Sequence, residues 1–356
     1  MLHFLTTFFR SALTAVFILL VGLSVSLGQQ SQTEHGQRIY VCNQGEATVT
    51  VIDVKTNEIT ANVDLKELGF SANAKPHHII AEPDGSHWYV TLIGENRVLK
   101  FNRDNELVGQ AQMEVPGLLN LHPAKNTLLV GRSMSAVNPP QSLGLINRTE
   151  MKTEQEISTF FARPHAIATT PSGEWTFIAS LATNQILSLN NETGETELTR
   201  YGGATHVFVD FAISPDGQTM VATGQVTGKA LIMDISDPAS PKVTKSIDVN
   251  AQPWHPVFSP DGKYVYFGNK EAHTVTVLNM ESQTVDAVIE GEGLAQPHGS
   301  ALSADGRYLY ISNNNRNGTY GASSNGTVAV INTETREIEK IIEVGAYPTG
   351  LGTNAW

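Results

Sequence analysis

The amino-acid sequence predicts an all-β fold: a seven-bladed β-propeller of four-stranded antiparallel blades, closed by N- and C-terminal strands that share one blade. Three observations support this prediction. A turn of the Pro-Asp-Gly type recurs at a nearly constant period, short strands of alternating polar and β-branched residues flank each turn, and the two ends of the chain supply complementary parts of one blade. From residue 38 onward, no segment has the 3.6-residue periodicity of an amphipathic helix.

The recurring turn sets the length of the repeat. Proline presets φ, aspartate bonds to its own backbone and glycine accepts a positive φ, so Pro-Asp-Gly favours a tight turn. Successive turns are 40, 48, 44, 45 and 44 residues apart, measured at their second residue. Four short strands fit in about 40–45 residues, which is the period of a propeller blade. The six turns are Glu82–Gly85, His122–Lys125, Thr170–Gly173, Ser214–Gly217, Ser259–Gly262 and Ser303–Gly306.

The two ends of the chain are expected to complete the ring. Tyr347–Gly350 repeats the opening of the repeat, and little sequence follows it. The missing strands of that unit are expected near the start of the propeller, at Tyr40–Asn43, Val49–Asp53 and Ile59–Leu65. We therefore expect residues 38–356 to form one domain of seven blades, with no free inner edge where the ring closes.

A segment typical of secretory signals precedes the propeller. The basic residue Arg10 is followed by the apolar run Ser11–Leu27, and small residues precede the junction with Gln29. We expect residues 1–28 to be a cleaved signal peptide and residues 29–37 a short linker, so the mature protein would be periplasmic or extracellular. The alternative is a membrane anchor, but an apolar run of 17 residues is marginal for spanning a bilayer. No stable membrane anchor is therefore expected after cleavage.

The charge of the chain limits its partners. The net charge is −12, and removal of residues 1–28 would take away one base, Arg10, and no acid. The remaining 22 basic and 35 acidic residues give −13, a sign that opposes binding to nucleic acid or to an anionic membrane surface. Cys42 is the only cysteine, so no intramolecular disulfide can form. Small residues recur at its position in the repeat, which indicates a packing role.

Two strand sequences carry a family resemblance. Tyr40-Val41-Cys42-Asn43 and Tyr89-Val90-Thr91-Leu92 are degenerate forms of one motif. On the basis of these motifs, residues 38–356 resemble the YVTN-repeat family of YncE-like β-propellers. The resemblance implies the propeller fold and an exported location. Propellers of this kind serve as binding modules, scaffolds, lactonases and redox enzymes, so the resemblance does not specify an activity.

Histidines gather at the start of the predicted innermost strands. The two positions after each blade's opening proline give fourteen equivalent positions, and five of them hold histidine. Innermost strands begin at one end of the central channel, so we expect these imidazoles to converge there. Adjacent strand residues point to opposite faces, so both positions can reach the channel only if the strand starts irregularly. The five residues are His77, His78, His165, His255 and His298, and His206 lies just upstream of the equivalent position in another blade.

Neutral imidazoles that converge in this way suit copper or zinc. Asp210 occupies an equivalent position and would fix a histidine tautomer. An adjacent histidine pair followed by single histidines from later blades is similar to the copper-cluster propeller of nitrous oxide reductase. This second resemblance implies copper at the five histidines, and less directly at His206. That family also has a cysteine-rich copper domain, which this chain lacks, so a simpler mono- or dinuclear site is expected.

Other residues near this end of the channel are candidate ligand contacts. The hairpins Arg132–Gln141 and Asn314–Gly326 are longer than the others, and long loops on a rigid scaffold often carry binding residues. Arg132 and Arg316 would then contact a ligand. Trp254, beside His255, would either stack on a ligand or fill the gap between blades.

These observations leave three classes of function open. The first is a binding protein whose histidine-rich channel rim captures a transition metal, a small ligand or a protein partner. The second is a copper-dependent oxidoreductase that uses the rim histidines. The third is a propeller-type lactonase, in which a rim histidine or Asp210 activates water with a divalent ion. The alternative to all three is a structural role, in which the imidazoles bond backbone carbonyls and hold neighbouring blades together.

Overall fold

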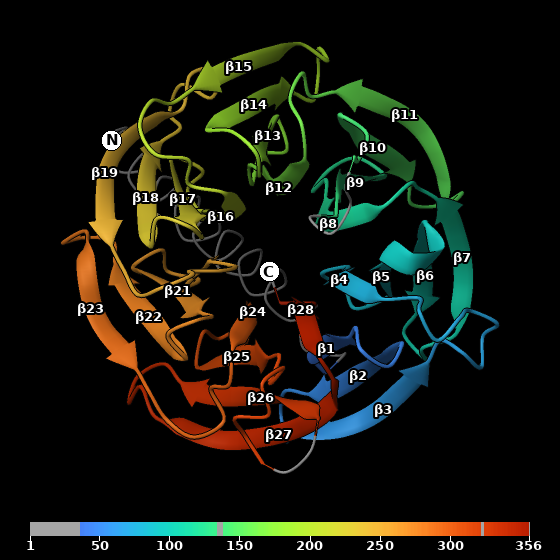
Figure 1. Cartoon of the computed structure of the whole chain (residues 1–356). Coiled ribbons are helices and arrows are strands. Elements are labelled where there is room, and N and C mark those ends of the chain that lie inside the picture. The colour runs from blue at the N-terminus through green and yellow to red at the C-terminus, as the bar shows by residue number, and fades with distance from the viewer. Residues whose placement is uncertain (1–35, 134–137, 322–323, 356) are drawn as a thin grey trace, which may run out of the picture. The chain divides into compact units, whose positions relative to one another are not determined.

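The structure, a computed structural model, describes residues 36–133, 138–321 and 324–355. From Gln37 onward the chain forms one compact unit. It consists of seven four-stranded antiparallel sheets arranged as blades around a central axis, which confirms the β-propeller (Figure 1). The predicted signal peptide, residues 1–28, and the linker up to residue 35 lie outside the described residues. In the described part of the chain, no helix is long and apolar enough to cross a membrane.

Each sheet runs outward from the axis in chain order, except for the one that closes the ring. The first three blades after the closing blade are β4 (Pro76–Ala81), β5 (His87–Leu92), β6 (Arg97–Asn102) and β7 (Leu107–Gln112), with the short 3₁₀ helix η1 (Ile93–Glu95) after β5; β8 (Pro116–Leu121), β9 (Thr127–Arg132), β10 (Ser142–Asn147) and β11 (Lys152–Ser158); and β12 (Pro164–Thr169), β13 (Trp175–Ser180), β14 (Gln185–Asn190) and β15 (Thr196–Arg200).

Three further blades follow the same order. They are β16 (Phe208–Ile213), β17 (Thr219–Gly224), β18 (Lys229–Asp234) and β19 (Lys242–Asp248); β20 (Val257–Phe258), β21 (Tyr264–Asn269), β22 (Thr274–Asn279) and β23 (Thr284–Ile289); and β24 (Pro297–Leu302), β25 (Tyr308–Asn313), β26 (Asn325–Asn332) and β27 (Ile338–Ala346).

The seventh blade closes the ring as predicted. Its inner strand is β28 (Pro348–Thr353), and its outer strands are β1 (Arg38–Asn43), β2 (Thr48–Asp53) and β3 (Glu58–Asp64). β28 pairs antiparallel with β1, with Tyr40 opposite Gly352 and Val41 opposite Leu351. The inner edge of the blade is therefore supplied by the other end of the chain, which leaves no gap in the ring.

Apolar side chains fill the space between adjacent blades. Trp88 stacks on Phe101 with ring centres 4.0 Å apart, and Tyr40 of the closing blade lies 5.2 Å from Trp88. Cys42 is fully buried in the same cluster, which confirms its packing role, and burial raises the pKa of its thiol. Sheets that pack face to face bury both faces of their central strands, so these strands lack the exposed positions of the outermost ones.

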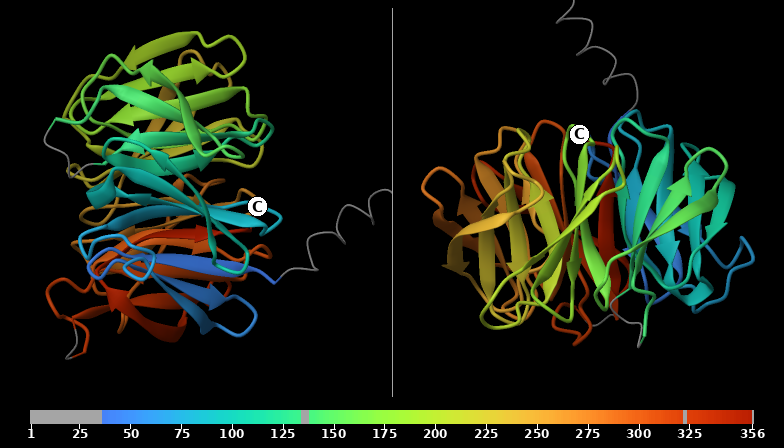
Figure 2. Two further views of the ribbon diagram at one scale, coloured as in Figure 1. Left: turned by 90° about the vertical axis from the view of Figure 1, so that its right-hand side faces the viewer. Right: turned by 90° about the horizontal axis from the view of Figure 1, so that it is seen from above.

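The Pro-Asp-Gly turns connect the first and second strands at one end of the ring, which we call the turn face. We call the opposite end, where the innermost strands begin, the histidine face. Figure 2 shows the ring edge-on, with the strands of each blade running between its two faces. Gly85, Gly217 and Gly306 have φ values of 70°, 72° and 70°, the left-handed conformation that made glycine the expected residue there.

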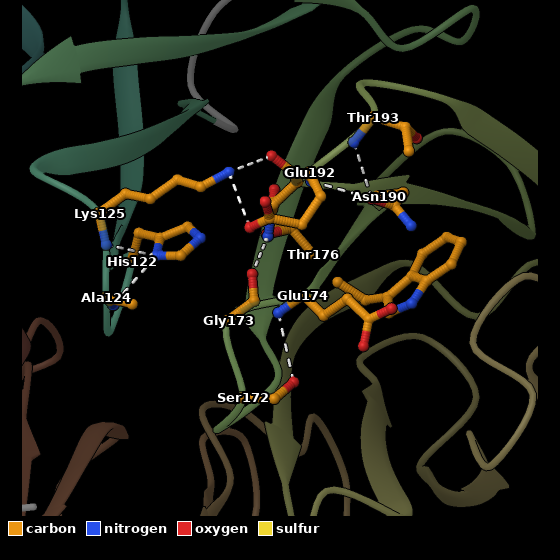
Figure 3. Close-up of polar contacts among 12 residues, drawn as sticks. His122, Ala124, Lys125, Ser172, Gly173, Glu174, Thr176, Asn190, Glu192 and Thr193 are labelled. Carbon is orange, nitrogen blue, oxygen red and sulfur yellow. Dashed lines mark hydrogen bonds and ion pairs between the residues drawn. The ribbon is translucent and has the colours of Figure 1, made fainter.

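One histidine outside the predicted site has a structural role at the turn face. The His122 ring accepts hydrogen bonds at Nδ1 from the backbone N–H groups of Ala124 (3.1 Å) and Lys125 (2.9 Å), which fixes the turn (Figure 3). The Lys125 ammonium then forms an ion pair of 3.0 Å with Glu192 of the next blade. A Cβ at Gly173 would lie 2.7 Å from the His122 ring, so glycine permits this close approach.

Candidate histidine site in the central channel

All five histidines at the starts of the innermost strands lie together in the structure. His77 and His78 belong to β4, His165 to β12 and His298 to β24, and His255 is separated from the start of β20 by Pro256. Their ring centres are 5.2 Å apart for His255–His298, 6.2 Å for His77–His165 and His78–His255, and 6.4 Å for His77–His298. The circular fold thus brings together imidazoles that lie in four different blades.

Bulges at the strand starts allow both positions of the repeat to face the channel. The register of the innermost strand shifts between Pro76 and Ile79, between Pro164 and Ala166, and between Pro297 and Ser300. A bulge breaks the strict alternation of side chains and re-aims the residues within it. His77 and His78 can therefore both join the cluster although they are adjacent in sequence.

Three of the histidines form a buried group, which we call the inner tier: His77, His165 and His298, which are 6%, 0% and 3% exposed. His165 donates from Nδ1 to the carbonyl oxygen of Arg132 (2.8 Å), and His77 donates from Nδ1 to Oε1 of Gln44 (3.1 Å). Since these oxygens only accept, each ring carries its proton on Nδ1 and leaves the Nε2 lone pair bare. Within the described residues, the buried Nε2 of His77, Nε2 of His165 and Nδ1 of His298 have no hydrogen-bond partner.

The inner tier is neutral at physiological pH. Burial lowers the pKa of His165 to about 4. The pKa values of His77 and His298 also fall well below the usual value, mainly because of burial and further because of nearby imidazoles and the Lys270 ammonium. The neutral imidazole with a bare lone pair is the form that binds metal ions.

The remaining two histidines and Asp210 form an outer tier. His255 donates from Nδ1 to Oδ2 of Asp210 at 2.7 Å, and the other carboxylate oxygen accepts the Phe211 N–H at 2.9 Å. The predicted role of Asp210 as an orienting partner thus has a matching contact. The Leu119 N–H donates to Nδ1 of His78 at 3.1 Å.

That contact sets the tautomer of His78. A nitrogen that accepts an N–H carries no proton, and burial lowers the pKa of His78 to about 3, so the ring is neutral with its proton on Nε2. His78 is then a hydrogen-bond donor, whereas the sequence analysis gave it the role of a metal ligand. The sequence could not show the donor role of His78, because it depends on a backbone N–H from the next blade.

His206, Arg132 and Arg316 lie outside the two tiers. The half-buried His206 ring stacks on Phe208 with centres 5.4 Å apart and bonds to Thr227 at 2.8 Å. The fully buried Arg132 guanidinium bonds to the Glu114 carbonyl and the Glu156 carboxylate, each at 2.7 Å, and so holds the base of its hairpin.

Arg132 still contributes to the site through its carbonyl group, which orients His165. Arg316 is exposed, and its backbone N–H donates to Oε1 of Gln296 at 2.9 Å. Its charge acts on the cluster's surroundings by lowering the pKa of Lys270.

Sequence reasoning missed Lys270. Its ammonium lies 4.5 Å from the centre of the Trp254 ring and 5.8 Å from that of Tyr347. The buried Trp254 ring in turn lies 4.3 Å from the His298 ring, so Trp254 packs between the lysine and the inner tier. Burial, and secondly the charge of Arg316, lower the pKa of Lys270 to about 8. No repeat position marks this lysine, because it lies in the hairpin after β21.

A cavity of about 750 Å³ extends through the channel from the outer tier to the turn face. His78, His255 and Asp210 line its inner end, and turn residues such as Pro83 and Pro171 line its outer end. The inner tier does not line it. The sequence analysis placed the channel opening at the histidine face, whereas this cavity approaches the cluster from the opposite side.

The donor atoms do not form a finished coordination sphere. Among residues 36–133, 138–321 and 324–355, no group of three or more His, Cys, Asp or Glu side chains has metal-holding geometry. Two imidazoles on one ion have ring centres about 5 Å apart at a tetrahedral angle and about 6.4 Å apart in a linear arrangement, given metal–nitrogen bonds near 2.0–2.1 Å. The distances from His77, 6.2 and 6.4 Å, lie close to the linear limit.

Comparisons with known proteins support the fold. No family model and no curated protein matches the sequence. A functionally unknown protein from Desulfotomaculum acetoxidans superimposes with a TM-score of 0.72 at 16% identity, over 88% of this chain and 98% of that one. The periplasmic gluconolactonase PpgL of Pseudomonas aeruginosa gives 0.69 at 16% identity, over 90% and 99%. Hydrazine synthase of Kuenenia stuttgartiensis gives 0.64 at 20% identity, over 78% and 89%.

At these identities the likeness shows the fold and leaves the activity open. Membership of the YVTN-repeat family stays a prediction from the strand motifs. The chain is a seven-bladed β-propeller, similar in architecture to hydrazine synthase and to gluconolactonase-like proteins.

Proposed function

We propose that the inner tier binds one transition-metal ion, copper or zinc, and that the protein is a metal-binding propeller. The observation that carries this proposal is the set of three buried ring nitrogens without partners, on His77, His165 and His298. Buried polar atoms in proteins are hydrogen-bonded in about 90% of cases, so three orphans in one cluster point to a ligand that satisfies them together.

The surroundings of the inner tier support the same proposal. Metal-bound histidines usually donate their second ring nitrogen to a carbonyl or amide oxygen, and His165 and His77 do so to Arg132 and Gln44. One shared ion would require the rings to move toward a common centre, because the ring centres of His165 and His298 lie 6.2 and 6.4 Å from that of His77. Imidazole nitrogens are ligands that suit copper and zinc ions.

The proposal includes an exported location. It is supported by the signal-like sequence of residues 1–28 and by the fold likeness to a gluconolactonase described as periplasmic. The partner at the site is then a metal ion taken up outside the cytoplasm.

Metal analysis tests the proposal. The protein is stripped with a chelator, loaded with Zn²⁺ or Cu⁺, desalted and analysed by inductively coupled plasma mass spectrometry. We expect one ion per chain. His165→Ala should weaken binding by at least about 10–100-fold, since loss of even an outer partner of a ligand has that effect. The matched control His206→Ala should bind as the wild type does. A wild-type protein that retains neither ion, or equal retention by His165→Ala, would contradict the proposal.

A second candidate function is lactone or ester hydrolysis at the outer tier. The observation that favours it is the 2.7 Å contact between His255 and Asp210 at the inner end of the cavity. A carboxylate that holds Nδ1–H leaves Nε2 as a base that can take a proton from water. The fold likeness to a gluconolactonase is consistent with this chemistry.

Turnover of a neutral aryl ester or a δ-lactone tests the second candidate. Asp210→Asn should lower kcat by about 100-fold or more, the contribution of general base catalysis. The control Asp248→Asn changes an exposed aspartate of β19 and should leave kcat unchanged. Equal rates for the wild type and Asp210→Asn would exclude this role for the pair.

A further inference from the structure

The channel cavity has the character of a ligand site in its own right. Its volume of about 750 Å³ lies within the range of about 300–1,000 Å³ that is typical of small-molecule pockets. Its wall is built from the innermost strands of all seven blades and is mostly apolar. Representative wall residues are Ile80, Leu119, Ile167, Phe211, Val257 and Leu302.

The polar groups of the cavity are concentrated at its inner end. Nδ1 of His78 accepts the Leu119 N–H at 3.1 Å, so the ring proton lies on Nε2. Among the described residues, no acceptor bonds to that Nε2–H. Nε2 is also absent from the set of fully buried atoms that lack a partner, so a ligand in the cavity can reach it. The Asp210 carboxylate lies at the same end and is bonded to His255 and to the Phe211 N–H.

We propose that this cavity binds an apolar small molecule that ends in a neutral carbonyl group, such as a ketone, an ester or a lactone. The apolar body would lie along the strand walls, and the carbonyl oxygen would accept the His78 Nε2–H. The inference does not depend on metal binding. It deepens the hydrolase candidate by naming the substrate class, but binding without turnover would still satisfy it.

Two features select a neutral carbonyl over other head groups. A donor at the end of an apolar pocket costs free energy when it is buried without an acceptor, so a pure hydrocarbon would bind less well. The Asp210 carboxylate would repel a ligand that carries a carboxylate of its own.

Binding of prodan, a neutral naphthalene ketone whose emission shifts to the blue in apolar surroundings, tests the inference. The titration uses the whole chain in the presence of EDTA, so that its result is independent of metal. We expect saturable binding of one molecule per chain with a blue shift. Ethylnaphthalene and naphthoate serve as competitors that lack the carbonyl group or carry a charge, and both should displace prodan less well than acetylnaphthalene does.

Two variants locate the site. Ser300→Phe places a large ring in the cavity from β24 and should abolish prodan binding. Its control, Val288→Phe on the exposed outer strand β23, should leave binding unchanged. His78→Phe should weaken prodan binding about three- to tenfold, the effect of one net hydrogen bond, and leave ethylnaphthalene binding unchanged.

Thermal unfolding of each variant confirms that it is folded. The inference is overturned if the wild type shows no saturable binding, or if Ser300→Phe binds prodan as the wild type does. It is also overturned if ethylnaphthalene or naphthoate competes as well as acetylnaphthalene. Prodan binding with no ester turnover would support the inference while contradicting the hydrolase candidate.

Discussion

At the scale of single residues, the roles of the five histidines are set by the atoms that contact Nδ1. Carbonyl and amide oxygens hold the proton on Nδ1 of His165 and His77 and leave lone pairs inside the cluster. A backbone N–H does the opposite for His78. Histidines at the first position after the opening proline are therefore metal-ligand candidates, whereas His78, at the second position, is a hydrogen-bond donor.

Gln44 tests the importance of these contacts for metal binding. Gln44→Ala removes the acceptor from His77 Nδ1–H, so the ring would no longer be held in one tautomer and orientation. We expect metal affinity to fall about 10–100-fold, as for other outer partners of metal ligands, when measured by competition with a chromogenic chelator. Gln110→Ala, on the exposed face of β7, is the control and should not change the affinity. Equal affinities for both variants would exclude an orienting role for Gln44.

Acid should destabilise the fold through the buried imidazoles. The pKa of His165 is about 4 in the folded protein and about 6.5 in the unfolded chain, so the folded state binds fewer protons in between. The stability contributed by neutral His165 is complete above pH 6.5 and is lost as the pH falls to 4. The free energy of unfolding should drop by about 3 kcal/mol from this residue alone.

Urea denaturation at several pH values between 7 and 4 measures this dependence. The fall in the free energy of unfolding between pH 7 and 4 should be smaller in His165→Gln, because glutamine does not titrate. His206→Ala should retain most of the wild-type slope, because that ring lies outside the buried cluster. A stability that does not change with pH, or an unchanged slope in His165→Gln, would contradict the neutral buried cluster.

The sequence predicts those parts of the site that follow from the repeat, and it does not predict contacts that depend on how distant segments fold together. The repeat identified His77, His165 and His298, because equivalent positions in the blades of a ring converge. It could not identify Lys270, whose contact with Trp254 depends on how a hairpin folds back. It also misjudged Arg132, since the carbonyl and carboxylate that hold the guanidinium come from other segments of the chain.

At the scale of elements, glycines allow the innermost strands to approach one another closely. A Cβ on Gly350 of β28 would lie 2.6 Å from the His77 carbonyl oxygen and 2.9 Å from the His78 Cα. Likewise, a Cβ on Gly299 of β24 would lie 2.7 Å from the Thr349 carbonyl oxygen of β28. Glycine thus recurs beside the histidines because a side chain at these positions would push apart the strands that carry them.

Gly350→Ala should therefore destabilise the ring and disturb the site. We expect a loss of about 1–3 kcal/mol in the free energy of unfolding, the usual cost of overpacking. Chemical denaturation measures the loss, and metal affinity should fall with it because β4 carries His77 and His78. Gly202→Ala is the control, since a Cβ there meets no atom within 4 Å. Equal stability of the two variants would show that the close approach has no energetic importance.

The elements themselves were largely predictable. Regular turns and alternating strands identified the blades, and the incomplete units at the two ends identified the shared one. The main departure is β20, which has only two residues. Pro253 and Pro256 flank Trp254 and His255 at its start, and proline cannot donate a backbone hydrogen bond to a neighbouring strand.

At the scale of the whole molecule, closure of the ring creates the site. The histidines come from segments as far apart in sequence as β4 and β24, and only a closed ring brings those strands to the same end of one channel (Figure 1). The channel then has two distinct parts, a buried cluster of imidazoles and an apolar cavity that opens toward the turn face. The first suits a metal ion and the second an apolar molecule, so the two can be tested separately.

X-ray absorption spectroscopy of the metal-loaded protein shows whether the inner-tier imidazoles share one ion. We expect two or three imidazole nitrogens at about 2.0 Å, with the outer-shell scattering of the rings, and loss of one of them in His165→Ala. A spectrum dominated by oxygen ligands without imidazole scattering, or one unchanged in His165→Ala, would contradict it.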